Sequence, residues 1–364
     1  MNKMKVGIIG CGNISAAYMK NIPGYAHLEL YACADIDVSR AQARAEEFAI
    51  PHAYTVEQLL GDPLVDIVIN LTIPAVHAEV CIQILEAGKH AYVEKPLAVT
   101  REEGQQILEV AKRKGLLIGS APDTFLGGGI QTCVKLIEDG WIGTPIAATA
   151  FMMWKGHEHW HPDPEFYYAK GGGPMFDMGP YYLTALVALL GPIRRVTGST
   201  AISFPERTIS SEKKRGQKIK VDTPTHVTGL IDFHSGAIAT MITSFDIMGG
   251  TRLPNIEIYG SHGSLRVPDP NTFGGQVMIR KNGSDWEPIP FSHGYKDPNR
   301  GLGVAAMAQA LITGDSSAHR ANGELAYHVL EAMHGFHDAS DAGQHYMMKS
   351  SCEKPAALNP QTVL

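Results

Sequence analysis

Glycines and an aspartate near the start of the chain have the spacing of a dinucleotide-binding site. Gly10-Cys11-Gly12-Asn13-Ile14-Ser15 joins a short apolar segment to a helical one. Gly10 permits a tight turn, Gly12 lets the backbone approach a pyrophosphate, and the start of the helix supplies free N–H groups. Asp35 ends the second predicted strand, where a carboxylate can accept both ribose hydroxyls of an adenosine. The third small residue is Ser15 instead of glycine, which is a minor departure from the pattern.

Asp35 and Arg40 bear on which dinucleotide is bound. A carboxylate beside a 2′-phosphate is repulsive, so Asp35 favours NAD over NADP. Arg40 could reach such a phosphate and soften this preference; alternatively it is a solvated cation in the first turn of the next helix.

Lys95 is the strongest candidate for a catalytic residue. It follows the predicted buried strand 90–93, at the carboxyl edge where α/β sheets bind ligands. An ammonium there can hydrogen-bond a reacting hydroxyl and stabilise the alkoxide-like charge that develops as a hydride leaves. The alternative is an ordinary surface lysine before a turn.

Composition and net charge exclude several classes of protein. The 364 residues are 44% hydrophobic and 19% charged, with a net charge of −6. There is no basic excess to favour nucleic acid, and no apolar stretch approaches the ~20 residues that cross a bilayer. Five scattered cysteines without a C-x-x-C pair argue against a disulfide framework, and favour reduced thiols and a cytoplasmic location.

The first part of the chain, residues 1–122, alternates predicted strands and helices. This alternation predicts βαβ units and a parallel, doubly wound sheet of the Rossmann type. Capping boxes are expected at Ser39 with Gln42, Thr55 with Gln58 and Thr100 with Glu103. The predicted strands are 5–9, 28–34, 66–71, 90–93 and 116–119, and helices are expected over 13–22 and 75–87.

Residues 123–350 contain consecutive predicted strands instead of alternating strands and helices. We therefore expect an α+β domain with a large, mostly antiparallel open sheet. The polar, basic segment 205–223 is interpreted as a solvated loop or hairpin, and residues 351–364 as a loose tail. The predicted strands are 224–233, 237–245, 254–259, 263–267 and 275–280, and the predicted helices are 130–139, 180–190, 302–313 and 321–340.

Three further segments, together with the glycine loop, resemble the Gfo/Idh/MocA family, the glucose–fructose oxidoreductase and inositol dehydrogenase group. They are LTIPAVH at 71–77, AGKHAYVEKP at 87–96 and GGGPMFDMGPY at 171–181. The resemblance covers nearly the whole chain. It implies a Rossmann domain followed by an open-sheet domain, a nicotinamide cofactor, and hydride exchange with a ring hydroxyl of a sugar or cyclitol. It also implies a homodimer or homotetramer assembled through the C-terminal sheet.

The resemblance and the glycine loop together give a set of expected site residues. In the family, the lysine of E-K-P has the catalytic role described above, and the following proline, here Pro96, is commonly a cis bend. The residues expected to contact the cofactor are Gly10, Gly12, Asn13, Ile14, Asp35, Ile36, Arg40, Thr72, Pro74, His77, Glu94 and Lys95.

Asp177 and Tyr181 occupy the family's D-x-G-x-H element. The resemblance implies that Asp177 orients substrate or holds a proton relay, whereas capping of the following helix is the alternative. Many members carry a catalytic histidine where this chain has Tyr181. A phenol is a poor base at neutral pH unless a cation is close, and we expect Lys95 to be that cation. Otherwise Tyr181 only lines the pocket.

A cluster of rings and imidazoles lies in WKGHEHWH at 154–161. It formally matches the zinc motif H-E-x-x-H, which needs a helix to bring both histidines to one face. Gly156 before the motif and Pro162 after it predict a loop, so no metal is expected. We interpret Trp154, His157, His159 and His161 as substrate-binding residues, because flat rings stack on a pyranose and imidazoles meet its hydroxyls. A structural role is the alternative.

The sequence therefore predicts an NAD(P)-dependent dehydrogenase that acts on a ring hydroxyl of a sugar or polyol. Two alternatives stay open: redox-assisted glycoside cleavage, in which transient oxidation acidifies a neighbouring C–H and the aglycone is eliminated, and a non-catalytic NAD-sensing regulator. Retention of Lys95 and Asp177 argues against the regulator.

Overall fold

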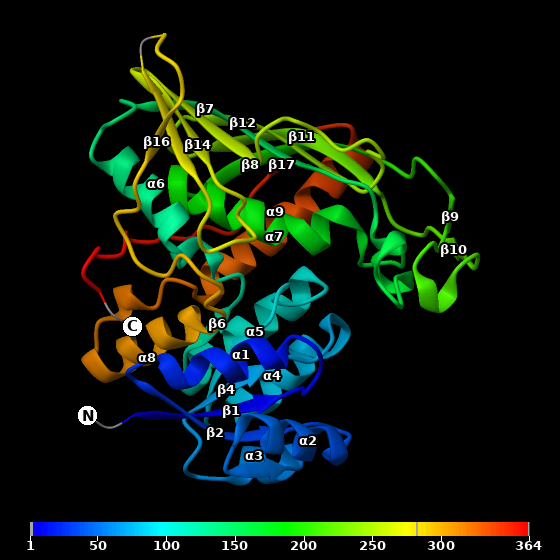
Figure 1. Cartoon of the computed structure of the whole chain (residues 1–364), viewed down its shortest axis with the longest axis vertical. Helices are drawn as coiled ribbons and strands as arrows, with labels where there is room; N and C mark the ends of the chain where they lie inside the picture. The colour runs from blue at the N-terminus through cyan, green and yellow to red at the C-terminus, as the bar shows by residue number, and fades with distance from the viewer. Residues whose placement is uncertain (1–2, 282, 363) are drawn as a thin grey trace.

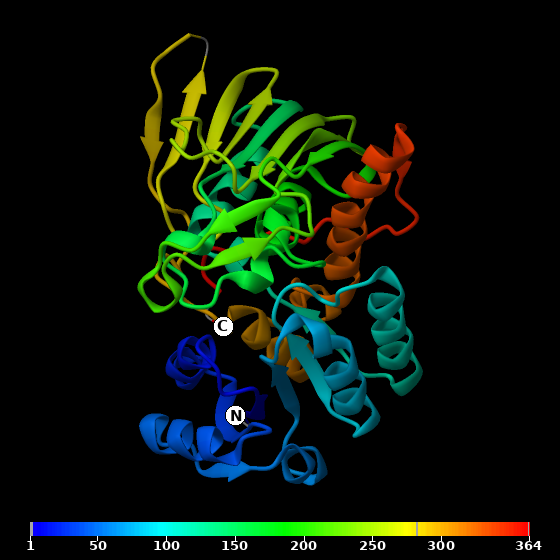
Figure 2. The same ribbon diagram turned by 90° about the vertical axis from the view of Figure 1, so that its right-hand side faces the viewer.

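The computed structural model describes residues 3–281, 283–362 and 364. Residues 1–2 of the predicted Rossmann domain and residue 363 of the predicted tail lie outside the described residues. Two domains are stacked along the long axis of the molecule, with a parallel sheet in the first and a larger sheet in the second (Figures 1 and 2). None of the described helices is long and apolar enough to cross a membrane.

The first domain is a six-stranded parallel sheet in the order β3-β2-β1-β4-β5-β6, which confirms the doubly wound prediction. The strand order reverses between β1 and β4, the place where such sheets bind ligands. Its strands are β1 Met4–Ile9, β2 Leu28–Ala34, β3 His52–Tyr54, β4 Ile67–Asn70, β5 His90–Val93 and β6 Ile118–Ser120. Its helices are α1 Ser15–Asn21, α2 Val38–Phe48, α3 Val56–Gly61, α4 His77–Glu86 and α5 Arg101–Lys114.

Two of the three predicted capping boxes are confirmed, at Thr55 and Thr100. The prediction at Ser39 is wrong. Helix α2 begins at Val38, and the carboxylate of Asp37 caps it by accepting a hydrogen bond from the Ser39 amide. Ser39 is thus already in the first turn, where its side chain cannot cap.

The second domain is a nine-stranded sheet in the order β16-β15-β14-β13-β7-β12-β11-β8-β17. Among the described strands of this sheet only the β7–β12 pair is parallel, so the mostly antiparallel prediction is confirmed. The strands are β7 Pro145–Met153, β8 Ile193–Ala201, β11 His226–Phe233, β12 Ile238–Ser244, β13 Ile256–Gly260, β14 Gly263–Val267, β15 Val277–Lys281, β16 Glu287–Ile289 and β17 Tyr346–Met347. The helices of this part are α6 Gly128–Glu138, α7 Gly173–Leu190, α8 Leu302–Thr313 and α9 Gly323–Ala342.

Helix α7 begins earlier than predicted. The predicted start is Pro180, a residue type that is favoured in the first turn of a helix. The structure has Pro174 in that first turn and Pro180 inside the helix. The helix is buried over most of its length between the sheet and its neighbours, and this packing outweighs the hydrogen bond lost at Pro180. The earlier start places Asp177 within the helix.

Segment 205–223 and the C-terminal tail are both ordered in the structure. Segment 205–223 forms a hairpin of β9 Glu206–Thr208 and β10 Lys218–Lys220, one of the two alternatives considered. The loose tail is a wrong prediction. The Leu358 amide donates to Gln131 Oε1 at 2.8 Å, and the Leu358 carbonyl lies 2.8 Å from His293 Nε2. The apolar side chains of Leu358 and Leu364 are buried, and their burial holds the tail against the second domain.

Candidate active site

The glycine turn after β1 has one glycine that the fold needs and one that it does not. Gly10 has φ +102°, and a Cβ there would lie 2.7 Å from the backbone of Leu71 at the end of β4. A Cβ on Gly12 would meet nothing within 4 Å. Gly12 therefore faces open space at the carboxyl edge of the sheet, where a bound pyrophosphate would take the room that a side chain leaves free.

Asp35 is fixed beside this turn. One carboxylate oxygen accepts a 2.8 Å hydrogen bond from the Cys11 amide, and the other accepts a 3.0 Å bond from the Asp37 amide. The carboxylate thus sits between the ends of β1 and β2, as the predicted ribose contact requires. Together with the open face of Gly12, it shows that the residues present fit a dinucleotide.

The other residues predicted at the adenosine end lie around this carboxylate. Ile36 is 97% exposed, and the Asn13 and Ile14 side chains are also exposed beside the turn. Arg40 pairs at 3.4 Å with Asp37 on the surface. Arg44, which sequence reasoning missed, is nearer to the turn, since its guanidinium donates to the Gly12 carbonyl at 3.4 Å.

The contrast between the two glycines gives a prediction. Gly12→Val should weaken NAD(H) binding at least tenfold, or about 1.4 kcal/mol, because the side chain fills the space for the pyrophosphate while touching no protein atom. Fluorescence titration with NADH measures the dissociation constant, and the melting temperature checks the fold. Gly61→Val is the matched control, since a Cβ at Gly61 also meets nothing within 4 Å. An unchanged dissociation constant in Gly12→Val would contradict the assignment of this turn.

His77 connects the turn after β4 with the turn after β5. Thr72 donates through both its amide and its hydroxyl to Asn70 Oδ1. His77 is 1% exposed, and its ring nitrogens lie 2.7 Å from the Pro96 carbonyl and 3.0 Å from the Thr72 carbonyl. The His77 ring therefore supports both turns from behind. Pro74 is exposed in front of them.

Lys95 lies at the end of β5, where Glu94 helps to fix the turn. The two Glu94 carboxylate oxygens accept hydrogen bonds from the Tyr18 hydroxyl at 2.8 Å and from the Lys95 amide at 3.0 Å. The Lys95–Pro96 peptide is cis, as the resemblance implies. The backbone of Lys95 is thus held on both sides, and its side chain leaves the Rossmann domain toward α7.

Lys95, Asp177 and His157 form one hydrogen-bonded group. Lys95 Nζ donates to the Asp177 carbonyl at 2.7 Å and to Asp177 Oδ1 at 3.0 Å. The other carboxylate oxygen of Asp177 lies 3.0 Å from His157 Nε2. The three side chains come from the turn after β5, from α7 and from the loop after β7, so the group connects the two domains.

Mutual attraction keeps the Lys95 ammonium and the Asp177 carboxylate charged. Burial alone raises the pKa of Asp177, but the Lys95 ammonium and the His157 hydrogen bond outweigh it and lower the pKa to about 2. Burial alone lowers the pKa of Lys95, but the facing Asp177, with Tyr181 and Glu94, raises it above its ordinary value. At neutral pH the group therefore presents an ammonium held by a carboxylate.

The Asp177 pKa gives a prediction for stability against pH. The folded-state value of about 2 is below the ordinary 3.8, so ionised Asp177 stabilises the fold above pH 3.8. This stabilisation is lost as the pH falls from 3.8 toward 2. The difference in the free energy of unfolding between wild type and Asp177→Asn should shrink across this window in urea titrations. Asp341→Asn, on the exposed surface of α9, is the matched control. A constant difference for Asp177→Asn would contradict the ion pair.

The hydrogen bonds of His157 define its tautomer. The indole N–H of Trp160, which can only donate, lies 3.1 Å from His157 Nδ1. Nδ1 is therefore the acceptor, Nε2 carries the proton, and His157 donates to Asp177. In this arrangement the imidazole has no free basic nitrogen. His157 thus holds Asp177 in place and is not poised to take a substrate proton.

Tyr181 has a different cationic partner from the one predicted. Its hydroxyl accepts a 3.1 Å hydrogen bond from Arg300 Nη2, whereas Lys95 Nζ lies over the ring, 5.3 Å from its centroid. Sequence reasoning missed Arg300. Asp123 lies behind it, fully buried, with one carboxylate oxygen 3.7 Å from Arg300 Nη1 and the other bonded to the amides of Gly301 and Gly303 at the start of α8.

The residues 154–168, here called the His157 loop, carry the other predicted substrate contacts. As predicted, the H-E-x-x-H segment is not on an α-helix, since His157–His159 is a single 3-10 turn. His159 Nδ1 lies 2.5 Å from the Gly156 carbonyl, His161 Nδ1 accepts from the Asp163 amide, and Trp154 is exposed. Of the three histidines only His157 reaches Asp177. Among the described residues, no group of three or more potential ligands is arranged to hold a metal ion.

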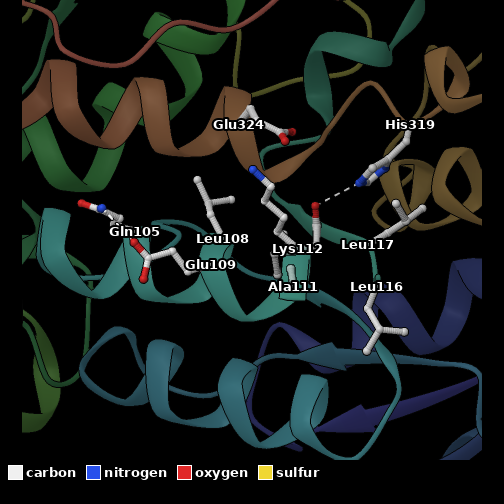
Figure 3. A pocket seen from close by; sticks show the side chains of 10 residues that line it. Gln105, Leu108, Glu109, Ala111, Lys112, Leu116, Leu117, His319 and Glu324 are labelled. Atoms are coloured by element: carbon white, nitrogen blue, oxygen red, sulfur yellow. Dashed lines mark hydrogen bonds between the residues drawn. The ribbon is translucent and has the colours of Figure 1, made fainter. Parts of the chain in front are cut away.

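A cavity of about 510 Å³ lies away from these residues (Figure 3). It opens between α5, β6 and the start of α9, and it shares no residue with the predicted site. Its lining residues are Gln105, Leu108, Glu109, Ala111, Lys112, Leu116, Leu117, Ile118, His319 and Glu324.

Two family profiles match the two halves of this architecture. One, described as the oxidoreductase family with an NAD-binding Rossmann fold, matches residues 4–121. The other, the GFO/IDH/MocA C-terminal domain, matches residues 130–266. The chain belongs to the Gfo/Idh/MocA family. The Lys95–Asp177–His157 group of this family member thus joins the NAD-binding Rossmann domain to the family's C-terminal domain.

Similar proteins include oxidoreductases that act on sugars and cyclitols. The chain is 24% identical to myo-inositol 2-dehydrogenase of Thermotoga maritima over 264 residues, 72% of this chain and 74% of that protein. It is 28% identical to an uncharacterized oxidoreductase of Schizosaccharomyces pombe over 209 residues, but spans only 55% of that protein and 54% of this chain. The fold matches levoglucosan dehydrogenase in complex with NADH and L-sorbose, with a TM-score of 0.81 and 20% identity over 96% of this chain and 100% of that one.

Proposed function

We propose that this protein is an NAD-dependent dehydrogenase that transfers a hydride between the nicotinamide and a ring hydroxyl of a sugar or cyclitol. The observation that carries the proposal is the junction of Lys95, Asp177 and Tyr181 at the carboxyl edge of an NAD-binding Rossmann sheet. The preference for NAD over NADP rests on Asp35 after β2, because a carboxylate would repel a 2′-phosphate bound beside it.

The proposed chemistry divides between an ammonium and a phenol. A nicotinamide bound at this edge of the sheet would supply the acceptor for the hydride of the carbinol carbon. Lys95 Nζ, held by Asp177, hydrogen-bonds the reacting oxygen and stabilises its developing negative charge. Tyr181 takes the hydroxyl proton, and the Arg300 guanidinium stabilises the phenolate that accepts it. His157 keeps Asp177 oriented toward Lys95.

Two further expectations accompany this function. The family resemblance leads us to propose a homodimer or homotetramer that assembles through the nine-stranded sheet, with a small-molecule substrate as the only other partner. The uncovered face of that sheet exposes Leu230 of β11 and Ile238 of β12, and exposed apolar side chains are frequent at protein interfaces. A cytoplasmic location stays a prediction from the reduced cysteines.

A screen of pyranoses, inositols and glycosides at fixed NAD tests the proposal. Absorbance of the reduced nicotinamide reports net oxidation, and chromatography reports products. Accumulation of NADH with a ring hydroxyl substrate supports the dehydrogenase. Turnover of a glycoside without net change of cofactor would replace it with redox-assisted glycoside cleavage. Tight NAD binding with no turnover of any compound would replace it with an NAD-sensing regulator.

A further inference from the structure

A buried arginine connects the polar hairpin to the His157 loop. The hairpin of residues 205–221, here called the clamp hairpin, projects beside this loop at the edge of the second domain (Figure 1). Most of its residues are exposed, but the Arg207 side chain is only 5% exposed. A buried guanidinium is costly unless its charge and its donors are met by partners, so its contacts indicate what the hairpin does.

Arg207 makes one hydrogen bond and two ion pairs around His157. Its Nη2 donates to the carbonyl of Phe245 at 2.6 Å, and its Nε lies 3.2 Å from Glu158 Oε1. Its Nη1 lies 3.2 Å from the buried carboxylate of Asp246. Glu158 is the chain neighbour of His157, and the Phe245 ring packs edge-on against the His157 ring with centroids 4.7 Å apart. The planar guanidinium of Arg207 thus connects the His157 loop to the end of β12, where Phe245 packs on His157.

The backbone of the loop is bound to the same hairpin. The Glu158 carbonyl accepts hydrogen bonds from the amides of Ser210 and Ser211, both at 2.9 Å. The Tyr168 hydroxyl donates to Glu158 and accepts from the His157 amide. The space under the loop is full, because a Cβ on Gly156 would lie 1.9 Å from the Tyr168 hydroxyl and 2.6 Å from Arg207 Nη2.

Exposed ion pairs also join the clamp hairpin to the His157 loop at the protein surface. Lys213 Nζ lies 2.7 Å and Lys214 Nζ 2.9 Å from the Asp163 carboxylate, and Lys214 also pairs with Glu165. Such surface pairs contribute little by themselves. We therefore attribute the attachment of the loop to the buried Arg207 guanidinium more than to these surface pairs.

We propose that Arg207 is a positioning residue: from the clamp hairpin it holds the His157 loop over Lys95 and Asp177, and so sets the affinity for the polyol. The inference rests on the proposed function for its substrate. The loop presents Trp160 and Tyr167 beside His157, with the Tyr167 ring centroid 4.0 Å from that of His157. Without Arg207, the loop keeps its sequence but loses the contacts that fix these rings relative to Asp177.

The experiment compares Arg207→Met, Arg207→Lys and Arg215→Met in the full chain. Arg215→Met is the matched control, since Arg215 is exposed on the same hairpin. Hydrogen exchange of the amides of residues 156–168, 210 and 211 reports the order of the loop without any need for turnover. NADH titration reports the cofactor site, and steady-state kinetics on the polyol found in the screen separate KM from kcat.

We expect Arg207→Met to speed exchange in the loop and to raise KM roughly tenfold, with a smaller fall in kcat and an unchanged NADH dissociation constant. Arg207→Lys, which keeps the charge without the planar fork, should lie between wild type and Arg207→Met, and it decides the question if Arg207→Met fails to fold. Arg215→Met should match wild type.

If hydrogen exchange in the His157 loop of a folded Arg207 variant is as slow as in wild type, the proposal that Arg207 holds the loop is overturned. Faster exchange with an unchanged KM would overturn its role in substrate affinity. If the wild-type enzyme turns over no polyol, the proposed function fails, and the exchange measurement still supports or overturns the hold of Arg207 on the loop.

Discussion

Replacing Lys95 with alanine should lower kcat by roughly 10³-fold, the range of a lost electrostatic stabiliser in a transition state. The ammonium is fixed by Asp177 through two hydrogen bonds, so it needs little rearrangement when charge develops on the substrate oxygen. This interaction strengthens as the hydride leaves, so kcat should fall more than KM rises. Stopped-flow and steady-state measurements of NADH formation give both constants.

The matched control for Lys95→Ala is Lys112→Ala, which removes an exposed lysine from α5 in the same domain. Lys112→Ala should behave as wild type in both kcat and NADH binding. A Lys95→Ala variant that is folded, binds NADH and retains kcat within a few-fold would remove Lys95 from the chemistry.

Replacing Tyr181 with phenylalanine should lower kcat by roughly 10²–10⁴-fold, as expected for loss of a general base. The ring stays beneath Lys95, and only the hydroxyl bonded to Arg300 is lost. The adjacent residue offers the matched control. The Tyr182 hydroxyl accepts from Asn255 Nδ2 at 2.7 Å, so Tyr182→Phe removes the same atom from the same helix without touching Arg300.

Tyr182→Phe should keep the wild-type kcat. A near-wild-type kcat in Tyr181→Phe, with the same pH profile, would reduce Tyr181 to a wall of the pocket. The double variant Lys95→Ala/Tyr181→Phe should be little worse than the poorer single variant, because groups that act as one unit are not additive. Full additivity would show that the ammonium and the phenol act independently.

Local pattern was enough to predict the Rossmann half and several of its site residues. Strands β2 and β5 have the predicted bounds, and Gly10, Gly12, Asp35 and Lys95 lie at the carboxyl edge of one sheet as expected. Each of these residues stands beside a strand whose apolar run marks its end. Their positions follow from chain order within a regular fold.

Arg300 and Arg207 could not be found in this way. Neither belongs to a motif, and each acquires its role from partners that are distant in sequence: Tyr181 for Arg300, and Glu158 and Asp246 for Arg207. The basic character of segment 205–223 was evident, but a single buried residue in it cannot be told from its exposed neighbours by composition. Only the tertiary path of the hairpin distinguishes Arg207 from Arg215.

Strand β8 was missed for a related reason. Its sequence contains Gly198, and glycine weakens a strand by its conformational freedom. In the structure a Cβ at Gly198 would lie 1.9 Å from the Phe336 carbonyl oxygen, so the glycine lets α9 pack directly on the strand. Close packing by a helix that comes much later in the chain thus overrides local propensity.

The position of β7 in the middle of the large sheet has a consequence for biosynthesis. β7 is the first strand of that sheet to leave the ribosome, yet its partners are Ile238–Ser244 on one side and Ile256–Gly260 on the other. Until both have been made, both edges of an apolar strand stay unpaired, and unpaired edges recruit other chains. We therefore expect nascent or truncated chains that end before β12 to aggregate or to bind chaperones, whereas chains that extend past β13 can pair both edges of β7.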